Sequence, residues 1–133
     1  MTFEPAALLF DMDGTLTDAR QPVTKEVRNI LDSLPNGLTK HIVTGSDMEK
    51  VEQQMSTDLL LSVFDRVYAC NGTRVYNCKL DMDDECRPIE PELIHKVSLL
   101  DHYSEADINH ITNVLLRIAA DTHTKIKTGT FVE

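Results

Sequence analysis

AALLFDMDGTLTDAR, residues 6–20, is the stretch that decides the fold. Its first five residues are apolar and lead into a turn that contains glycine, a pattern typical of a short buried strand. Asp11 and Asp13 follow this strand, one residue apart, and Gly14 and Thr15 come directly after them. Because side chains in an extended chain repeat their direction every two residues, we expect both carboxylates on the same side. Open α/β sheets bind ligands at the carboxyl ends of their strands, so this pair predicts a binding site.

The two carboxylates favour a cation beside them, because like charges repel. Mg²⁺ suits this position, since it binds carboxylate oxygens and a substrate phosphate together. One carboxylate can attack phosphorus to form an aspartyl phosphate, while the other moves a proton at the oxygen opposite. A solvated turn and a calcium loop are the alternatives, but a calcium loop continues with further oxygen ligands, whereas Leu16 follows here. We therefore interpret Asp11 and Asp13 as catalytic residues and as ligands of Mg²⁺.

The residues after this stretch predict a βαβ unit. A helix is expected over residues 24–34, because apolar residues recur on one face, Thr24 can cap its start and Pro35 follows its end. A second strand is expected over residues 40–43. Two strands joined by a helix are typical of a parallel sheet with a right-handed crossover.

The second predicted strand ends in Thr44-Gly45-Ser46-Asp47, which leads into another helix. The free N–H groups and the positive end of the dipole at a helix N-terminus bind phosphate well. We therefore expect Thr44 and Gly45 to contact a phosphate. Ser46 is expected either to contact it as well or to serve only as the N-cap, because Glu49 lies at the spacing of a capping box.

A third strand is expected over residues 65–69, followed by a tight turn at Asn71-Gly72 and a returning strand over residues 73–76. The composition then changes, and the acidic segment 81–85 is interpreted as a solvated linker.

Two helices are expected after this linker. One covers residues 91–100, and the other begins at Ser104, where Asp107 completes a capping box. These patterns divide the chain into residues 1–80, part of a parallel α/β core, and residues 81–133, the beginning of another domain.

Composition excludes several classes of protein. The chain of 133 residues has a net charge of −9, which argues against a nucleic-acid surface because such a surface needs a basic patch. The three cysteines lack C-x-x-C spacing, so free thiols in a reducing compartment are expected. Neither a signal peptide nor an apolar run long enough to span a membrane is evident, and we expect a cytoplasmic location without a membrane partner.

DMDGTLTD, residues 11–18, resembles motif I of the haloacid dehalogenase (HAD) superfamily, D-x-D-G-T-L-T/V-D. A basic residue soon after the motif, here Arg20, is typical of the eukaryotic-type phosphomannomutase family. T-G-S-D at residues 44–47 is similar to HAD motif II, although phosphomannomutases commonly have G-G-S-D there. Residues 64–77, FDRVYACNGTRVYN, resemble the phosphomannomutase stretch that ends in E-N-G, with Cys70 in place of Glu.

The last six residues, TGTFVE at 128–133, resemble the phosphomannomutase cap segment R-G-T-F-I-E. The family's Arg, which helps to hold the substrate phosphate, is replaced by Thr128. Lys125 and Lys127 are nearby cations that we expect to substitute for it, although Lys does not reproduce a bidentate Arg contact.

The resemblance implies a fold and a reaction. The fold is a partial Rossmann-like HAD core with parallel strands, followed by the beginning of an α+β cap. The reaction interconverts mannose 6-phosphate and mannose 1-phosphate, in the metabolism that supplies GDP-mannose. Asp11 is implied as the nucleophile that carries the phosphoryl group, Asp13 as the general acid/base, Thr44 with Gly45 as the phosphoryl cradle and Arg20 as a contact of the sugar phosphate. Phosphomannomutases dimerise through the cap, so a homodimer through the cap-like region is expected.

The resemblance covers nearly the whole chain but only the first half of the family's length. HAD motifs III and IV, which follow the cap in phosphomannomutases, do not occur in these 133 residues. We therefore expect an amino-terminal part of the fold that binds Mg²⁺ weakly and turns over slowly or not at all. A HAD-type phosphatase of sugar phosphates and a non-catalytic interaction module are the alternative functions.

Overall fold

The structure is a computed structural model, which describes residues 7–79 and 90–122. The chain divides into two compact units, Met1–Lys96 (unit 1) and Val97–Glu133 (unit 2). The elements of unit 1 are β1 (Ala7–Phe10), α1 (Lys25–Asp32), β2 (Thr39–Val43), α2 (Met48–Met55), α3 (Thr57–Val63), β3 (Arg66–Ala69), the 3₁₀-helix η1 (Cys70–Gly72), β4 (Arg74–Asn77) and β5 (Glu92–Lys96). Unit 2 contains the 3₁₀-helix η2 (Leu99–Asp101) and α4 (Glu105–Asp121).

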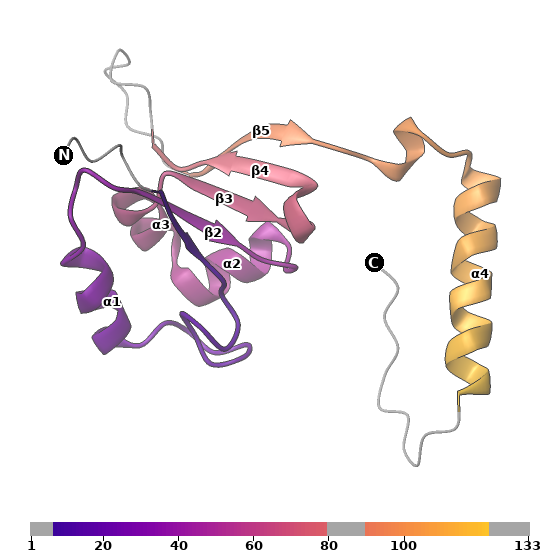
Figure 1. Cartoon of the computed structure of the whole chain (residues 1–133), viewed down its shortest axis with the longest axis horizontal. Helices are drawn as coiled ribbons and strands as arrows, with labels where there is room; N and C mark the ends of the chain where they lie inside the picture. Colours follow the sequence, from indigo (N-terminus) through magenta and orange to yellow (C-terminus); the bar gives the residue numbers. More distant parts are fainter. Residues whose placement is uncertain (1–6, 80–89, 123–133) are drawn as a thin grey trace, which may run out of the picture. The chain divides into compact units, whose positions relative to one another are not determined.

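Unit 1 is built on a five-stranded sheet in which the strands follow their order along the chain, from β1 to β5 (Figure 1). β1 pairs in parallel with β2, and β2 pairs in parallel with β3. β4 returns antiparallel to β3, and β5 is antiparallel to β4. The predicted βαβ unit and the hairpin after β3 are therefore confirmed, and the carboxyl ends of the three parallel strands lie at one edge.

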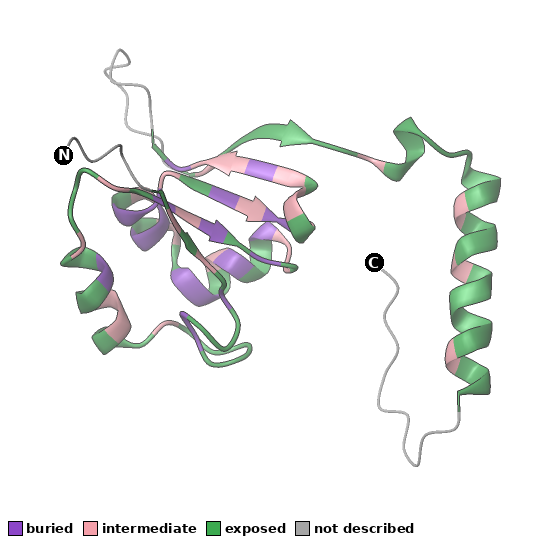
Figure 2. Cartoon of the chain, in the orientation of Figure 1, coloured by how far each residue is buried: buried purple, intermediate pink, exposed green. Residues whose placement is uncertain are grey.

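The core lies between one face of the sheet and the three helices of unit 1, as the purple segments of Figure 2 show. In β2, Lys40 and Ile42 are buried whereas Thr39 and Val43 are exposed, which is the alternation of a sheet covered on one face. The largest side chains that are fully buried are Phe64, Met12, Ile42, Met55, Leu59, Leu60, Val51, Val67 and Cys78. Burial of these side chains supplies the main favourable free energy of folding.

The other face and the first edge of the sheet are less protected. β1 has a single neighbour in the described sheet, β2, and the side chain of Leu9 is 66% exposed. Val43 lies on the same face and is 40% exposed. All four residues of β1 are uncharged.

The loop after β1 is fixed to α2 by buried polar contacts. The side chains of Met12 and Thr17 turn inward and are 0% and 4% exposed. The hydroxyl of Thr17 donates to Oε1 of the buried Gln54 at 2.8 Å, and the N–H of Val23 donates to the carbonyl of Gln54 at 2.8 Å. These contacts hold the loop that carries Asp13 against the helix that follows β2.

The carboxylate of Asp65, just before β3, ties together two neighbouring segments. It accepts from the N–H of Lys40 at 2.7 Å and from the ammonium of Lys79 at 3.1 Å. The ammonium of Lys40 is itself buried and donates to the carbonyls of Pro35 and Leu38. Asp65 therefore links the start of β2 to the residues that follow β4.

Two parts of the chain differ from the predictions. The helix predicted over residues 91–100 was wrong: residues 92–96 form β5, and residues 99–101 form η2. Leu93, one of the residues that suggested a helical face, lies opposite Tyr76 of β4, and this pairing depends on residues distant in sequence. The sequence reading also missed α3, although Leu59 and Leu60 at its centre are fully buried.

In unit 2, α4 begins as predicted. The hydroxyl of its N-cap, Ser104, accepts from the N–H of Asp107 at 3.2 Å, and the carboxylate of Asp107 accepts from the N–H of Ser104 at 3.1 Å. The hydrogen bonds from Ser104 lower the pKa of Asp107 below its ordinary value. Among the described residues, none of the helices combines the length and the apolar character that crossing a membrane requires.

Cys70 and Cys78 are free thiols, as expected, and Cys86 lies outside the described residues. Burial raises the pKa of Cys78 to about 12, so this thiol stays protonated at neutral pH.

We expect Thr17→Val to lower the free energy of unfolding by about 1–2 kcal/mol, because it leaves the buried Oε1 of Gln54 without its hydroxyl donor. Urea unfolding followed by circular dichroism measures this loss. Thr39→Val, at an exposed position of β2, is the matched control and should change stability little. Equal stability of Thr17→Val and the unchanged chain would contradict the structural role of this contact.

A second prediction concerns pH. Burial on its own raises the pKa of Asp65, but the hydrogen bonds from Lys40 and Lys79 and the positive charge of Lys79 outweigh it, so the folded-state pKa lies below the ordinary value of 3.8. The ionised carboxylate therefore stabilises the fold above this value, and the stabilisation is lost as the pH falls through the lowered pKa. We expect Asp65→Asn to cost about 1 kcal/mol at neutral pH and progressively less on acidification. Unfolding at several pH values tests this, with Asp32→Asn as the control; a cost independent of pH would count against it.

Candidate functional site

The candidate site lies at the carboxyl ends of β1 and β2, where two loops meet. Asp11 and Asp13 are exposed, whereas Met12 between them is fully buried. The loop continues through Gly14, whose φ of 82° lies in the left-handed region that favours glycine. Backbone hydrogen bonds within the loop stabilise this turn, because N–H groups donate to the carbonyl of Met12, including that of Leu16 at 3.0 Å.

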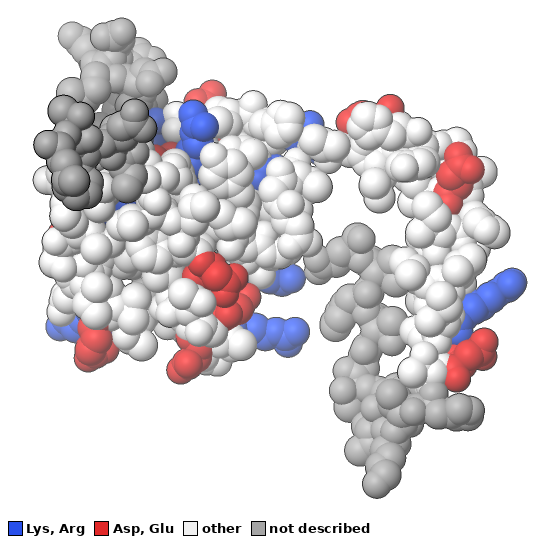
Figure 3. Space-filling view, in the orientation of Figure 1, with Lys and Arg blue, Asp and Glu red and all other residues white. Residues whose placement is uncertain are grey.

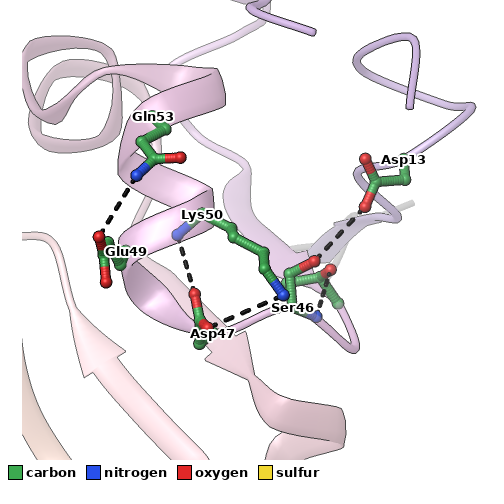
Figure 4. Close-up of polar contacts among 7 residues, drawn as sticks. Asp13, Ser46, Asp47, Glu49, Lys50 and Gln53 are labelled. Carbon is green, nitrogen blue, oxygen red and sulfur yellow. Dashed lines mark hydrogen bonds and ion pairs between the residues drawn. The ribbon is translucent and has the colours of Figure 1, made fainter. Parts of the chain in front are cut away.

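Asp13 is the residue that joins the two loops. Its Oδ2 accepts from the hydroxyl of Ser46 at 3.4 Å, the contact drawn between them in Figure 4. Its Oδ1 accepts from the backbone N–H of Arg20 at 3.1 Å. The structure thus brings together three residues that are predicted to act at the site: Asp13, Ser46 and the backbone of Arg20.

Asp11 lies at the end of β1 with a local hydrogen bond. Its Oδ2 accepts from the hydroxyl of Thr15 at 3.0 Å. Thr15 was not among the predicted site residues, and its spacing of four from Asp11 within the turn is the sequence signal that could have found it. The hydroxyl of Thr15 orients Oδ2 of Asp11, and the exposed carboxylate can still react with an electrophile.

The turn after β2 folds around the hydroxyl of Thr44. This side chain is 5% exposed, and its Oγ1 accepts from the N–H of Ser46 at 3.1 Å. Thr44 therefore shapes the turn from inside, while Gly45 and Ser46 form its outer part.

The capping box predicted at Ser46 and Glu49 was wrong. Asp47 is the N-cap of α2, and its side chain accepts from the N–H of Lys50 at 2.9 Å. Glu49 instead accepts from the side chain of Gln53 at 3.4 Å, as Figure 4 shows. Because Asp47 caps the helix, the hydroxyl of Ser46 is left to bond with Asp13.

A third segment, the loop after β3, also contacts the turn after β2. The N–H of Cys70 donates to the carbonyl of Ser46 at 2.9 Å, and the N–H of Asn71 donates to the carbonyl of Thr44 at 3.0 Å. Sequence reasoning placed a turn at Asn71-Gly72 but did not connect it to the site. The remaining predicted contact, Lys127, lies outside the described residues.

The donor set fits Mg²⁺ in part. Asp11 and Asp13 offer two exposed carboxylates, and Mg²⁺ is commonly bound by one or two carboxylates with water and substrate phosphate as its other ligands. Within residues 7–79 and 90–122, no group of three or more His, Cys, Asp or Glu side chains is placed to hold a metal ion. On the face shown in Figure 3, the described Lys and Arg side chains lie apart and form no continuous basic surface.

Comparison with known proteins gives the family. The model of the eukaryotic phosphomannomutase family matches residues 27–133. A probable phosphomannomutase from Caenorhabditis elegans is 36% identical over 129 residues, which cover 95% of this chain and 46% of that protein. Phosphomannomutase 1 from Homo sapiens is 33% identical over 131 residues, 98% of this chain and 45% of that protein. The chain spans about half the length of the curated relatives it matches.

Two solved structures show a similar fold. The chain matches a phosphatase of the haloalkanoate (HAD) enzyme superfamily from Bacteroides thetaiotaomicron with a TM-score of 0.50 at 20% identity, over 86% of this chain and 35% of that one. It matches an IMP-nucleotidase from Plasmodium falciparum with a TM-score of 0.51 at 16% identity, over 88% of this chain and 35% of that one. The predicted fold class, a partial α/β core of the HAD type, is confirmed.

The match to the family model extends from α1 to the last residue of the chain, and the alignments with curated relatives extend over nearly all of it. The chain belongs to the eukaryotic phosphomannomutase family.

Proposed function

We propose that this chain carries the phosphoryl-accepting half of a phosphomannomutase site, which interconverts mannose 6-phosphate and mannose 1-phosphate. The observation that carries the proposal is the contact of Asp13 with Ser46, which holds the aspartate loop against the turn after β2 in a member of this family. The hydroxyl of Ser46 lies beside the exposed carboxylate of Asp13, and the exposed carboxylate of Asp11 follows the neighbouring strand β1. This combination suits a phosphoryl group that is transferred to a carboxylate.

Asp11 is proposed as the nucleophile. A carboxylate oxygen attacks the phosphorus of a hexose bisphosphate, the bond between phosphorus and the sugar oxygen breaks, and Asp13 gives its proton to the departing oxygen. In the reverse direction, Asp13 removes a proton from the hydroxyl of a hexose monophosphate, and this oxygen takes the phosphoryl group from Asp11. This transfer gives a hexose bisphosphate, and return of its other phosphoryl group to Asp11 releases the isomeric monophosphate.

The neighbouring residues are proposed to bind and orient the substrate. Thr44, Gly45 and Ser46 are proposed to contact the transferred phosphoryl group, and Oγ1 of Thr44 also accepts from the N–H of Ser46 within the turn. The guanidinium of Arg20 contacts the phosphate of the sugar, and Lys127 is the second cation proposed for this role. Asp11 and Asp13 would also hold Mg²⁺, which supplies positive charge that offsets the repulsion between carboxylate and phosphate.

The domain division, the oligomeric state and the location of this chain are further proposals. Residues 1–80 are proposed as part of the core and residues 81–133 as the beginning of the cap, with β5 pairing across this boundary to the sheet of the core. A homodimer through the cap-like region and a cytoplasmic location are also proposed. A sugar-phosphate phosphatase and a non-catalytic module remain alternative functions. An assay of products separates them, because a mutase gives the isomeric hexose phosphate, a phosphatase gives free phosphate and a non-catalytic module gives neither.

The test uses the full chain with Mg²⁺ and a hexose bisphosphate, followed by acid quenching and mass spectrometry of the peptide that contains residues 7–20. We expect one phosphoryl group on Asp11, and we expect Asp11→Asn to reduce labelling by at least about 10³-fold because an amide is not a nucleophile here. Asp32→Asn, an exposed Asp of α1, is the matched control and should label normally. Labelling that persists in Asp11→Asn would refute the assignment, as would an unlabelled wild-type chain that also fails to bind beryllium fluoride, a phosphoryl mimic.

A further inference from the structure

The loop at the end of β3 has an unusual backbone. Cys70, Asn71 and Gly72 have φ values of 49°, 56° and 85°, so three successive residues lie in the left-handed region. For a residue with a side chain, this conformation is strained, although Asn tolerates it better than most residues. Such a loop persists only where its surroundings fix it, and its surroundings here are the turn of the candidate site.

Two backbone hydrogen bonds join this loop to both ends of that turn. The N–H of Asn71 donates to the carbonyl of Thr44 at 3.0 Å, and the N–H of Cys70 donates to the carbonyl of Ser46 at 2.9 Å. Between them, the N–H of Ser46 is occupied by Oγ1 of Thr44. The left-handed backbone is what lets two successive N–H groups reach carbonyls on either side of Gly45.

The side chain of Asn71 covers the centre of the turn. A Cβ atom added at Gly45 would lie 3.2 Å from Oδ1 of Asn71, and 3.8 Å from both Cγ and Nδ2. Gly45 itself does not have a positive φ, unlike Gly14 and Gly72. The close approach of this carboxamide, rather than the backbone conformation, therefore explains why glycine suits position 45.

We propose that Asn71 is a positioning residue for the Thr44–Ser46 turn. Its N–H and its carboxamide hold the turn from outside while the hydroxyl of Thr44 holds it from inside, and the turn in this conformation directs Ser46 toward Asp13. Because binding of a phosphoryl group requires its donors to be already aligned, Asn71 sets the affinity of the turn for that group. The identity of the ligand in this inference rests on the proposed function, whereas the role of Asn71 in the geometry of the turn does not.

The first measurement needs no ligand. Hydrogen exchange of the Ser46 amide is followed by NMR in the full chain and in Asn71→Gly, which keeps the left-handed backbone and the N–H of residue 71 and removes the whole side chain with its carboxamide. Asn36→Gly, in the turn between α1 and β2, is the matched control. We expect exchange at Ser46 to rise about tenfold in Asn71→Gly and to stay unchanged in Asn36→Gly. Exchange within about twofold of wild type in Asn71→Gly would overturn the proposal whatever the protein binds.

A double-mutant cycle tests the contact itself. Gly45→Ala should also raise exchange at Ser46, because the new methyl group meets Oδ1 of Asn71. Removing this carboxamide in Gly45→Ala/Asn71→Gly should give less than the sum of the two single effects. Strict additivity would show that the two side chains do not act on one another and would overturn the proposal.

The second measurement is binding of beryllium fluoride in the presence of Mg²⁺, observed by ¹⁹F NMR. We expect Asn71→Gly to weaken binding about tenfold with little change in melting temperature, and Asn36→Gly to bind as wild type does. Wild-type affinity in Asn71→Gly would overturn the proposed role. If the wild-type chain binds no beryllium fluoride, the proposed function fails, and the exchange at Ser46 still decides whether Asn71 holds the turn.

Discussion

The parallel pairing of β1 with β2 is the constraint on which the candidate site depends. Ala7 is opposite Thr39 and Phe10 is opposite Ile42, so both strands end at the same edge of the sheet. The loops that follow them must therefore meet, and Asp13 and Ser46, 33 residues apart in sequence, come within hydrogen-bond distance. The parallel pairing of β2 with β3 then brings the loop at Asn71 to the same edge.

Polar contacts inside the fold convert this proximity into a defined geometry. The buried hydrogen bond between Thr17 and Gln54 fixes the loop after β1 to α2. The helix α2 directly follows the turn after β2. Asp47 caps this helix, and the hydroxyl of Ser46 is consequently available for Asp13. A helix cap and a buried hydrogen bond thus help to determine which groups are exposed at the candidate site.

The sequence was informative where structure follows from neighbouring residues. The helix α1 begins at the predicted cap, Thr24, and ends before Pro35, because both signals are local. The exposed position of Asp11 and Asp13 at the end of β1 could be predicted from the strand and turn that surround them. Prediction failed where distant residues decide the outcome. Pairing with β4 makes a strand of residues 92–96, and neither the partner of Gln54 nor the contact of Asn71 with Gly45 can be inferred from local spacing.

The exposed side of β1 has a consequence for the handling of this protein. Within the part of the chain that the structure describes, β1 pairs along one side alone and carries no charge, Pro or bulge, so its other side offers a template for another extended chain. The side chain of Leu9 adds an apolar contact for any chain that attaches there. Pairing through this template would depend on protein concentration, because it joins two separate chains.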